Sequence, residues 1–173
     1  MTARSSDTAS LKIRMTVHPI KLRLSNAYLL KGERSVLVDT GSPGEAEKIL
    51  ETLESHGMTL ADLTLILHTH VHSDHVGSTA ALLKLHKSPV AYHRGDEGLM
   101  RLGNNGRLMG VGLRGKVMAR VFSGGAFDRF EPKFYLEDSM RLDDYGVAAT
   151  VTHARSHVRF GLDLARQRGS NSR

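Results

Sequence analysis

The stretch LTLILHTHVHSDHVG, residues 63–77, determines how the rest of the chain is interpreted. Its first five residues are a continuous apolar run of strand length, which predicts a buried strand over Leu63–Leu67. An apolar stretch of helical character begins at Val76. The polar residues between them are therefore expected to form a tight turn at the carboxyl end of a strand.

Four residues of metal-ligand type lie within six positions of this turn, namely His70, His72, Asp74 and His75. Alternate residues of an extended segment face the same side, so His70 and His72 can reach one metal ion together. Asp74 and His75 follow as the chain turns into the helix and can be aimed at an adjacent position. Imidazole nitrogens and a carboxylate suit Zn²⁺. The sequence predicts zinc, as one ion or as a binuclear site, with iron or manganese as alternatives.

The sequence of this turn allows two other interpretations. His68 offers a competing register, since residues 68, 70 and 72 also alternate. Only the register that begins at His70 ends on the pair Asp74-His75, so we interpret His68 as structural or as a neighbour of the ligands. A histidine-rich surface turn is the second alternative, but such a turn would not directly follow an apolar strand or need an Asp-His pair.

The composition indicates a soluble single domain of 173 residues. No apolar run approaches the ~20 residues of a membrane span, and residues 1–15 lack the apolar stretch of a secretory signal. We therefore expect a cytoplasmic protein with no membrane partner. The chain has no cysteine, which excludes disulfides and thiolate ligands.

The net charge of +6 is unevenly distributed. Residues 152–173 contain five arginines and a single acidic residue, so the remainder is close to neutral. This tail has one aromatic residue, Phe160, whereas a nucleic-acid binder usually carries a basic face interleaved with aromatics. We expect a small-molecule substrate and no nucleic-acid partner.

Short β-rich runs separated by turn residues predict a strand meander at the start of the chain and further strands along it. The predicted strands are Val17–Leu24, Ala27–Leu30, Ser35–Asp39, Leu63–Leu67, Pro89–Tyr92, Lys133–Leu136 and Val147–Val151.

Two helices are predicted between these strands. The first begins with Ser42 as the cap and Pro43 at the first helical position, and it ends at Gly57. The second covers Val76–Leu85. Residues 103–125 contain seven glycines without clear periodicity and are interpreted as a long loop. They include a GxGxxG string, which no strand precedes, so it does not indicate a dinucleotide site.

The pattern HxHxDH at residues 70–75 is similar to the metal-binding signature of the metallo-β-lactamase superfamily. Two upstream stretches extend the resemblance, NAYLL at residues 26–30 and LVDTG at residues 37–41. The resemblance covers about residues 17–151. It implies an α/β fold, the four-layer αββα sandwich of that family.

The resemblance also implies a division of roles. His70 and His72 would hold a first zinc ion, and Asp74 and His75 a second. The metals would ionise a water molecule whose hydroxide attacks a carbonyl carbon. Asp74 would also orient this hydroxide, which makes it the candidate catalytic residue.

Three features of the sequence indicate which enzymes of the superfamily the chain resembles most. Position 72 is His, whereas the di-iron flavoprotein branch has Glu. The chain shows neither the export signal nor the cysteine ligand of antibiotic-hydrolysing members. The resemblance therefore points to glyoxalase II-like thioesterases, lactonases and general metal-dependent hydrolases. A single-iron enzyme resembling persulfide dioxygenases is an alternative.

The C-terminal part departs from the family pattern. The family places a further ligand histidine in a string like HTPGHTxGS, followed by a bridging Asp and a final His. Here His157 follows His153 by four residues, but Arg155-Ser156 replace the Pro-Gly between them, and no histidine follows. We take His157 as the candidate further ligand. The second half of the sandwich is expected to be incomplete, so the chain is either a poor hydrolase or a non-catalytic metal-binding fragment.

These observations divide the chain into a disordered leader (1–14), an N-terminal metallo-β-lactamase-type part (15–151) and an atypical Arg-rich tail (152–173). If the codons of the tail are read one nucleotide later, they permit the string His-Thr-Pro-Gly-His-Thr-Ser-Gly-Ser directly after Val151. We therefore expect a truncated, frameshifted product of a longer hydrolase gene, whose tail has no packed structure.

Overall fold

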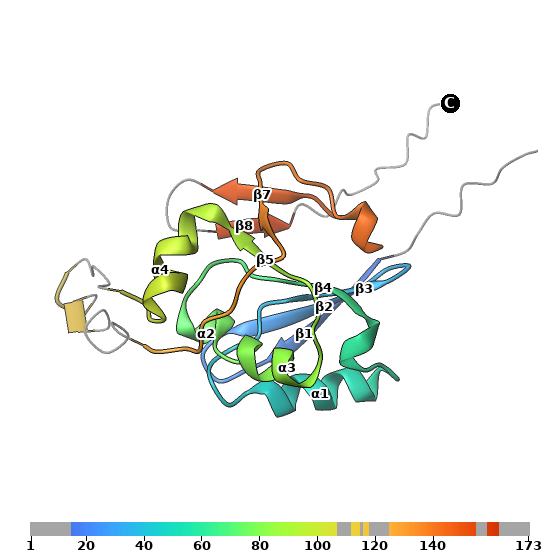
Figure 1. The fold of residues 1–173 in the computed structure, drawn as a ribbon, viewed down its shortest axis with the longest axis horizontal. Helices are drawn as coiled ribbons and strands as arrows, with labels where there is room; N and C mark the ends of the chain where they lie inside the picture. The colour runs from blue at the N-terminus through green and yellow to red at the C-terminus, as the bar shows by residue number, and fades with distance from the viewer. Residues whose placement is uncertain (1–14, 107–111, 115, 118–124, 155–158, 163–173) are drawn as a thin grey trace, which may run out of the picture.

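The structure, a computed structural model, describes residues 15–106, 112–114, 116–117, 125–154 and 159–162. Its largest element is a six-stranded sheet with the order β1-β2-β3-β4-β5-β6 (Figure 1). The first three strands pair antiparallel, and β3 to β6 run parallel. The predicted meander and the strands predicted over Leu63–Leu67, Pro89–Tyr92 and Lys133–Leu136 are confirmed, with some ends shifted. The strands are β1 (Thr16–Lys21), β2 (Asn26–Lys31), β3 (Ser35–Val38), β4 (Leu63–Leu67), β5 (Val90–His93) and β6 (Phe134–Leu136).

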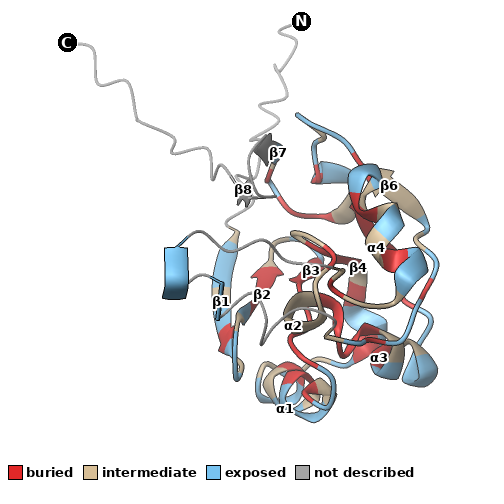
Figure 2. Cartoon of the chain, turned by 90° about the vertical axis from the view of Figure 1, so that its left-hand side faces the viewer, coloured by how far each residue is buried: buried red, intermediate tan, exposed pale blue. Residues whose placement is uncertain are grey.

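Two helices cover one face of this sheet, α1 (Ala46–Ser55) and α3 (Thr79–Leu85) (Figures 1 and 2). They are amphipathic, and their apolar sides join one face of the strands in a single core. Its central members include Leu29, Leu37, Ile49, Leu53, Ile66 and Leu82. A further helix, α4 (Glu97–Leu102), follows β5 where no helix was predicted.

The opposite face of the sheet packs against the chain that follows β6. Val38, Leu65 and Leu67 form a second core there with Leu142 and Val147. Strand β4 is therefore buried on both faces, which explains its continuous apolar run. A small second sheet of β7 (Val151–Ala154) and β8 (Arg159–Leu162) lies on this side (Figure 1). Helices, a large sheet and a second sheet follow the order of an αββα sandwich, so the predicted fold class is confirmed.

The strand predicted over Val147–Val151 is wrong in position, because β7 only begins at its last residue. The preceding residues fold back, and the Leu142 N–H donates to the Ala149 carbonyl at 2.9 Å. The cause is a turn of 3₁₀ helix over Asp143–Tyr145, which ends at Gly146 with φ 80°. Glycine adopts this left-handed conformation without a steric penalty.

Regular structure extends into the C-terminal tail, since β8 pairs antiparallel with β7. The prediction of a tail without packed structure after residue 151 differs from this strand pairing. The leader and most of residues 107–124, including half of the GxGxxG string, lie outside the described residues. The proposed division into three segments stays a prediction.

The cap predicted for the first helix is wrong. Helix α1 begins at Ala46, and Ser42 and Pro43 belong to a turn before it. The Glu45 carboxylate accepts hydrogen bonds from the backbone N–H groups of Ser42 and Arg23, both at 2.6 Å. Glu45 thus reaches back three residues as in a capping box. It ties this turn to the β1–β2 connection, and the helix starts only after it.

The second predicted helix, Val76–Leu85, is two helices, α2 (Ser73–Val76) and α3. The break lies at Gly77, whose N–H donates to the Gly41 carbonyl at 2.8 Å. A Cβ atom on Gly77 would lie 2.3 Å from the Pro43 ring, so only glycine permits this approach. A contact between distant segments therefore interrupts an otherwise helical pattern.

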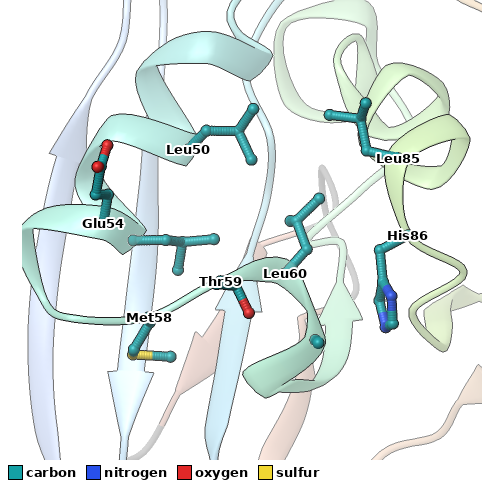
Figure 3. Close-up of a pocket in the computed structure, with 9 residues that line it drawn as sticks. Leu50, Glu54, Met58, Thr59, Leu60, Leu85 and His86 are labelled. Carbon is teal, nitrogen blue, oxygen red and sulfur yellow. The ribbon is translucent and has the colours of Figure 1, made fainter.

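A shallow groove of about 480 Å³ lies at the amino end of β4 (Figure 3). Most of its lining is apolar and comes from α1, α3 and the segment that leads into β4. The apolar lining residues are Leu50, Leu53, Met58, Leu60, Ala61 and Leu85.

Among the described helices, none is both long enough and apolar enough to cross a membrane.

Candidate metal centre

The segment of residues 68–76, called here the metal turn, follows β4 at the carboxyl end of the parallel part of the sheet. His68 continues the sheet, because its N–H donates to the Ala91 carbonyl at 2.9 Å. Strand β3 ends beside it at Asp39, whose N–H donates to the Leu67 carbonyl at 2.9 Å. Since β3 and β4 are parallel, Asp39 and the metal turn lie at the same sheet edge.

The four predicted ligands of the metal turn lie together. The ring centroids of His70 and His72 are 4.7 Å apart, and those of His70 and His75 are 4.0 Å apart. The His75 Nε2 atom lies 3.5 Å from Asp74 Oδ2, with side-chain exposures of 21% and 29%. Three imidazoles and a carboxylate are therefore concentrated in a half-buried cluster that is still accessible.

The surroundings of His70 and His72 lower the pKa of both imidazoles. Burial lowers the pKa of His70 to about 4, and the neighbouring His75 and His72 act in the same direction. Burial is also the largest influence on the pKa of His72, which is lowered. At neutral pH both rings are neutral, which is the form that binds a metal ion.

Asp39 organises the turn from the neighbouring strand. Its carboxylate accepts hydrogen bonds from the Thr69 N–H at 2.8 Å and the Thr69 hydroxyl at 2.7 Å. It also accepts from His75 Nδ1 at 2.8 Å. Because an ionised carboxylate can only accept, the His75 proton is on Nδ1. In the neutral ring, the Nε2 lone pair then faces the side of Asp74.

Asp39 and His75 each favour the charged form of the other. Burial acts to raise the pKa of Asp39, but the imidazoles of His68 and His75 outweigh it and hold the pKa well below its usual range. Burial acts to lower the pKa of His75, but the hydrogen bond to Asp39 and the charges of Asp39 and Asp74 raise it. Asp39 also has a positive φ of 59°. Non-glycine residues adopt this conformation rarely, although Asp and Asn tolerate it best.

Sequence reasoning assigned no role to Asp39. The available signal was the LVDTG string, which placed this aspartate at the end of a strand but not beside His75. The pairing depends on the parallel register of β3 and β4, and it joins residues 36 positions apart.

His68 contacts polar groups beside the metal turn, and its Nδ1 atom lies 3.6 Å from Asp39 Oδ1. It is fully buried, and its Nε2 atom lies 3.0 Å from the Thr79 hydroxyl at the start of α3. The Thr79 hydroxyl lies 2.9 Å from that of Thr40, which donates to the His75 carbonyl at 3.1 Å. This buried chain of polar groups anchors the end of the metal turn. These contacts fit both interpretations of His68, as a structural residue and as a neighbour of the ligands.

The donor chemistry of the turn fits zinc, since burial keeps the imidazoles of His70 and His72 neutral and the Asp39 carboxylate fixes the tautomer of His75. Within the described part of the chain, no three His, Asp or Glu side chains converge as a complete metal site. The rings of His70 and His75 instead lie against each other, with planes at 47°. His157 lies outside the described residues, so its role as a further ligand stays a prediction.

The chain belongs to the metallo-beta-lactamase superfamily, whose family model matches residues 20–166. Among curated proteins, it is 44% identical over 50 residues to metallo-beta-lactamase domain-containing protein 1 of Xenopus laevis, covering 29% of this chain and 22% of that protein. It is 39% identical over 77 residues to hydroxyacylglutathione hydrolase of Chromohalobacter salexigens, covering 44% and 29%. It is 30% identical over 128 residues to the "Probable metallo-hydrolase YqgX" of Bacillus subtilis, covering 72% and 56%.

Solved structures show the same fold. The subclass B3 metallo-beta-lactamase BJP-1 of Bradyrhizobium japonicum superposes with a TM-score of 0.66 at 19% identity, covering 86% of this chain and 52% of that chain. The class B3 di-zinc enzyme LRA-12 from an Alaskan soil metagenome gives a TM-score of 0.67 at 20% identity, covering 87% and 54%. This chain therefore spans about half the length of these structures, and its matches cover about a fifth to just over half of the curated relatives.

Proposed function

We propose that this chain carries the zinc-binding turn of a hydrolase that cleaves a carbonyl ester-type bond, in a thioester, a lactone or a related compound. The observation that supports it most is the cluster of three imidazoles and a carboxylate at one sheet edge, with His75 oriented by Asp39. A ligating histidine whose second nitrogen donates to a carboxylate is the usual arrangement in zinc sites.

In this proposal His70 and His72 hold one zinc ion, and Asp74 and His75 hold or adjoin a second. When bound, zinc supplies positive charge that lowers the pKa of water and stabilises a developing oxyanion. The side chains contribute their own tasks. Burial keeps the His70 lone pair available at neutral pH. Asp74, part-exposed beside His75, would accept a hydrogen bond from the attacking water.

Thioesters are the favoured substrate class, because two of the relatives are hydroxyacylglutathione hydrolases, whose named substrate is a thioester. They are 39% identical over 77 residues and 34% identical over 86 residues. A non-catalytic metal-binding fragment is the second candidate. It is favoured by the described residues, which do not form a complete three-ligand group.

Hydrolysis of an acylglutathione by the purified, zinc-loaded chain separates these candidates. We expect zinc-dependent turnover, slower than the roughly 10 s⁻¹ of a typical enzyme. Asp74→Asn should lower it by about 10²-fold or more, the usual contribution of a proton-accepting group. Asp62→Asn, at the other end of β4, should leave it unchanged. A chain that binds zinc but hydrolyses neither thioesters nor lactones would support the metal-binding fragment instead.

A further inference from the structure

The metal turn is held by a residue from a distant segment, Asn105. The Asn105 side-chain oxygen accepts a hydrogen bond from the Ser73 N–H at 2.6 Å, and its amide nitrogen donates to the Ser73 hydroxyl at 3.1 Å. Asn105 is only 5% exposed. One buried amide thus binds both the backbone and the side chain of the residue that lies between His72 and Asp74.

Asn105 is itself fixed by its own segment. Its N–H donates to the Gly125 carbonyl at 3.1 Å, and the Phe127 N–H donates to the Gly103 carbonyl at 3.0 Å. A Cβ atom on Gly125 would lie 2.5 Å from the Ser73 hydroxyl oxygen and 2.8 Å from the Asn105 amide nitrogen. The backbone therefore packs directly on the hydrogen-bonded pair, which leaves the Asn105 amide little freedom to rotate.

The Ser73 N–H needs such a partner. Ser73 is the first residue of α2, a helix of four residues, and its cap residue His72 makes no side-chain capping hydrogen bond. The first N–H groups of a helix have no acceptor within the helix. Asn105 supplies that acceptor from outside, while on the other side the Ser25 hydroxyl donates to the Asp74 carbonyl.

We propose that Asn105 is a positioning residue for the metal centre, which sets the directions of His72 and Asp74 by fixing Ser73 between them. The inference rests on the proposed function, because it assumes that these two residues are ligands. A role in attaching residues 103–106 and 125–127 to the rest of the domain would use the same hydrogen bonds. It would change stability but leave the ligand geometry of the folded protein unaltered.

The two roles are separated by loading the full chain with Co²⁺ and recording its visible absorption spectrum at saturation, together with zinc affinity by chelator competition. In Asn105→Ala we expect an altered spectrum and zinc affinity reduced by about 10-fold or more, as for other groups that orient ligands. Asn105→Asp keeps an acceptor for the Ser73 N–H and should restore most of the affinity. Asn104→Ala is the matched control, because the hydrogen bonds that this side chain makes to described residues stay within its own segment, to Leu102 and Gly106.

Ser73→Ala provides a second test if Asn105→Ala does not fold, since it removes only the hydroxyl contact. We expect a smaller spectral change and an affinity loss of about 3-fold, the effect of losing one weak neutral hydrogen bond. If a folded Asn105→Ala protein, or Ser73→Ala in its place, has the wild-type spectrum and affinity, the positioning role is overturned while the metal site stands. If the wild-type chain binds neither metal, both the proposed function and this inference fail.

Discussion

The two ends of β4 differ in chemistry. At the carboxyl end, the buried carboxylate of Asp39 has a positive φ and binds Thr69 and His75 of the metal turn. At the amino end lies the apolar groove, and the nearby carboxylate of Asp62 is exposed and caps a single helical turn through Thr59. Of the two carboxylates, only Asp39 is buried and has a positive φ. Because both features cost stability, their position beside the metal turn supports the proposal that this end carries the function.

The largest expected effect comes from Asp39→Asn. Asparagine tolerates the positive φ, so the change removes the charge without adding backbone strain. Its NH₂ group would face the donors of Thr69 and His75, and His75 would shift its proton to Nε2, the metal-binding side. We expect a loss of about 3 kcal/mol in the free energy of unfolding, as when one partner of a buried pair is removed. Zinc affinity should fall by about 10- to 100-fold.

Urea denaturation of the metal-free chain and chelator competition measure these two effects. Asp62→Asn is the control at the other end of β4, where the carboxylate accepts from the Thr59 N–H at 2.7 Å. It should lower stability less and leave zinc affinity unchanged. Equal losses of zinc affinity in the two variants would remove the distinction between the two ends.

The next effect concerns the pH dependence of stability. The unfolded chain takes up a proton at His70 near pH 6.5, whereas the folded chain does so only near pH 4, because burial lowers the pKa to about 4. Between these values the unfolded state binds more protons, so stability falls as the pH decreases. We expect His70 to contribute about 1 kcal/mol per pH unit to this slope.

Urea denaturation of metal-free wild type and His70→Gln between pH 7 and pH 4 tests this contribution. The variant should show the shallower decline. Parallel curves would mean that His70 is not held neutral by its surroundings.

The smallest effect is expected at the groove. Leu85 is 64% exposed, so Leu85→Ala removes little buried surface. Its free energy of unfolding should change by less than about 0.5 kcal/mol, as for most surface substitutions. Zinc affinity should be unchanged. A loss of zinc affinity in this variant would show that the two ends of β4 are coupled, contrary to the account above.

The sequence predicted those features of the fold and the site that depend on residues close together in the chain. The buried strand over Leu63–Leu67 is a local feature, and it lies where the sequence predicted it. The ligand pattern at residues 70–75 is also local, and its role in binding metal stays a prediction. The sequence did not predict the roles of Asp39 and Asn105, whose partners lie 36 and 32 residues away. Nothing in a local pattern encodes those pairings, because they arise from the register of parallel strands and from the packing of a returning segment.

The misplaced elements have the same origin. The predicted helix over Val76–Leu85 is interrupted at Gly77 by contact with Pro43, and the predicted strand over Val147–Val151 is shifted by the turn that ends at Gly146. In each case hydrophobic periodicity was present, but a tertiary contact or a left-handed glycine determined where the element began or ended.

The central claim is that residues 70–75 bind zinc, and elemental analysis of the dialysed full chain tests it most directly. We expect about one or two zinc ions per wild-type chain and a near-complete loss in the His70→Ala, His72→Ala double variant. His18→Ala, His56→Ala is the matched control, because these two histidines also lie close together, with nitrogen atoms 3.3 Å apart, but belong to β1 and the end of α1. This control should keep the wild-type zinc content. Full zinc content in the His70→Ala, His72→Ala variant would contradict the account.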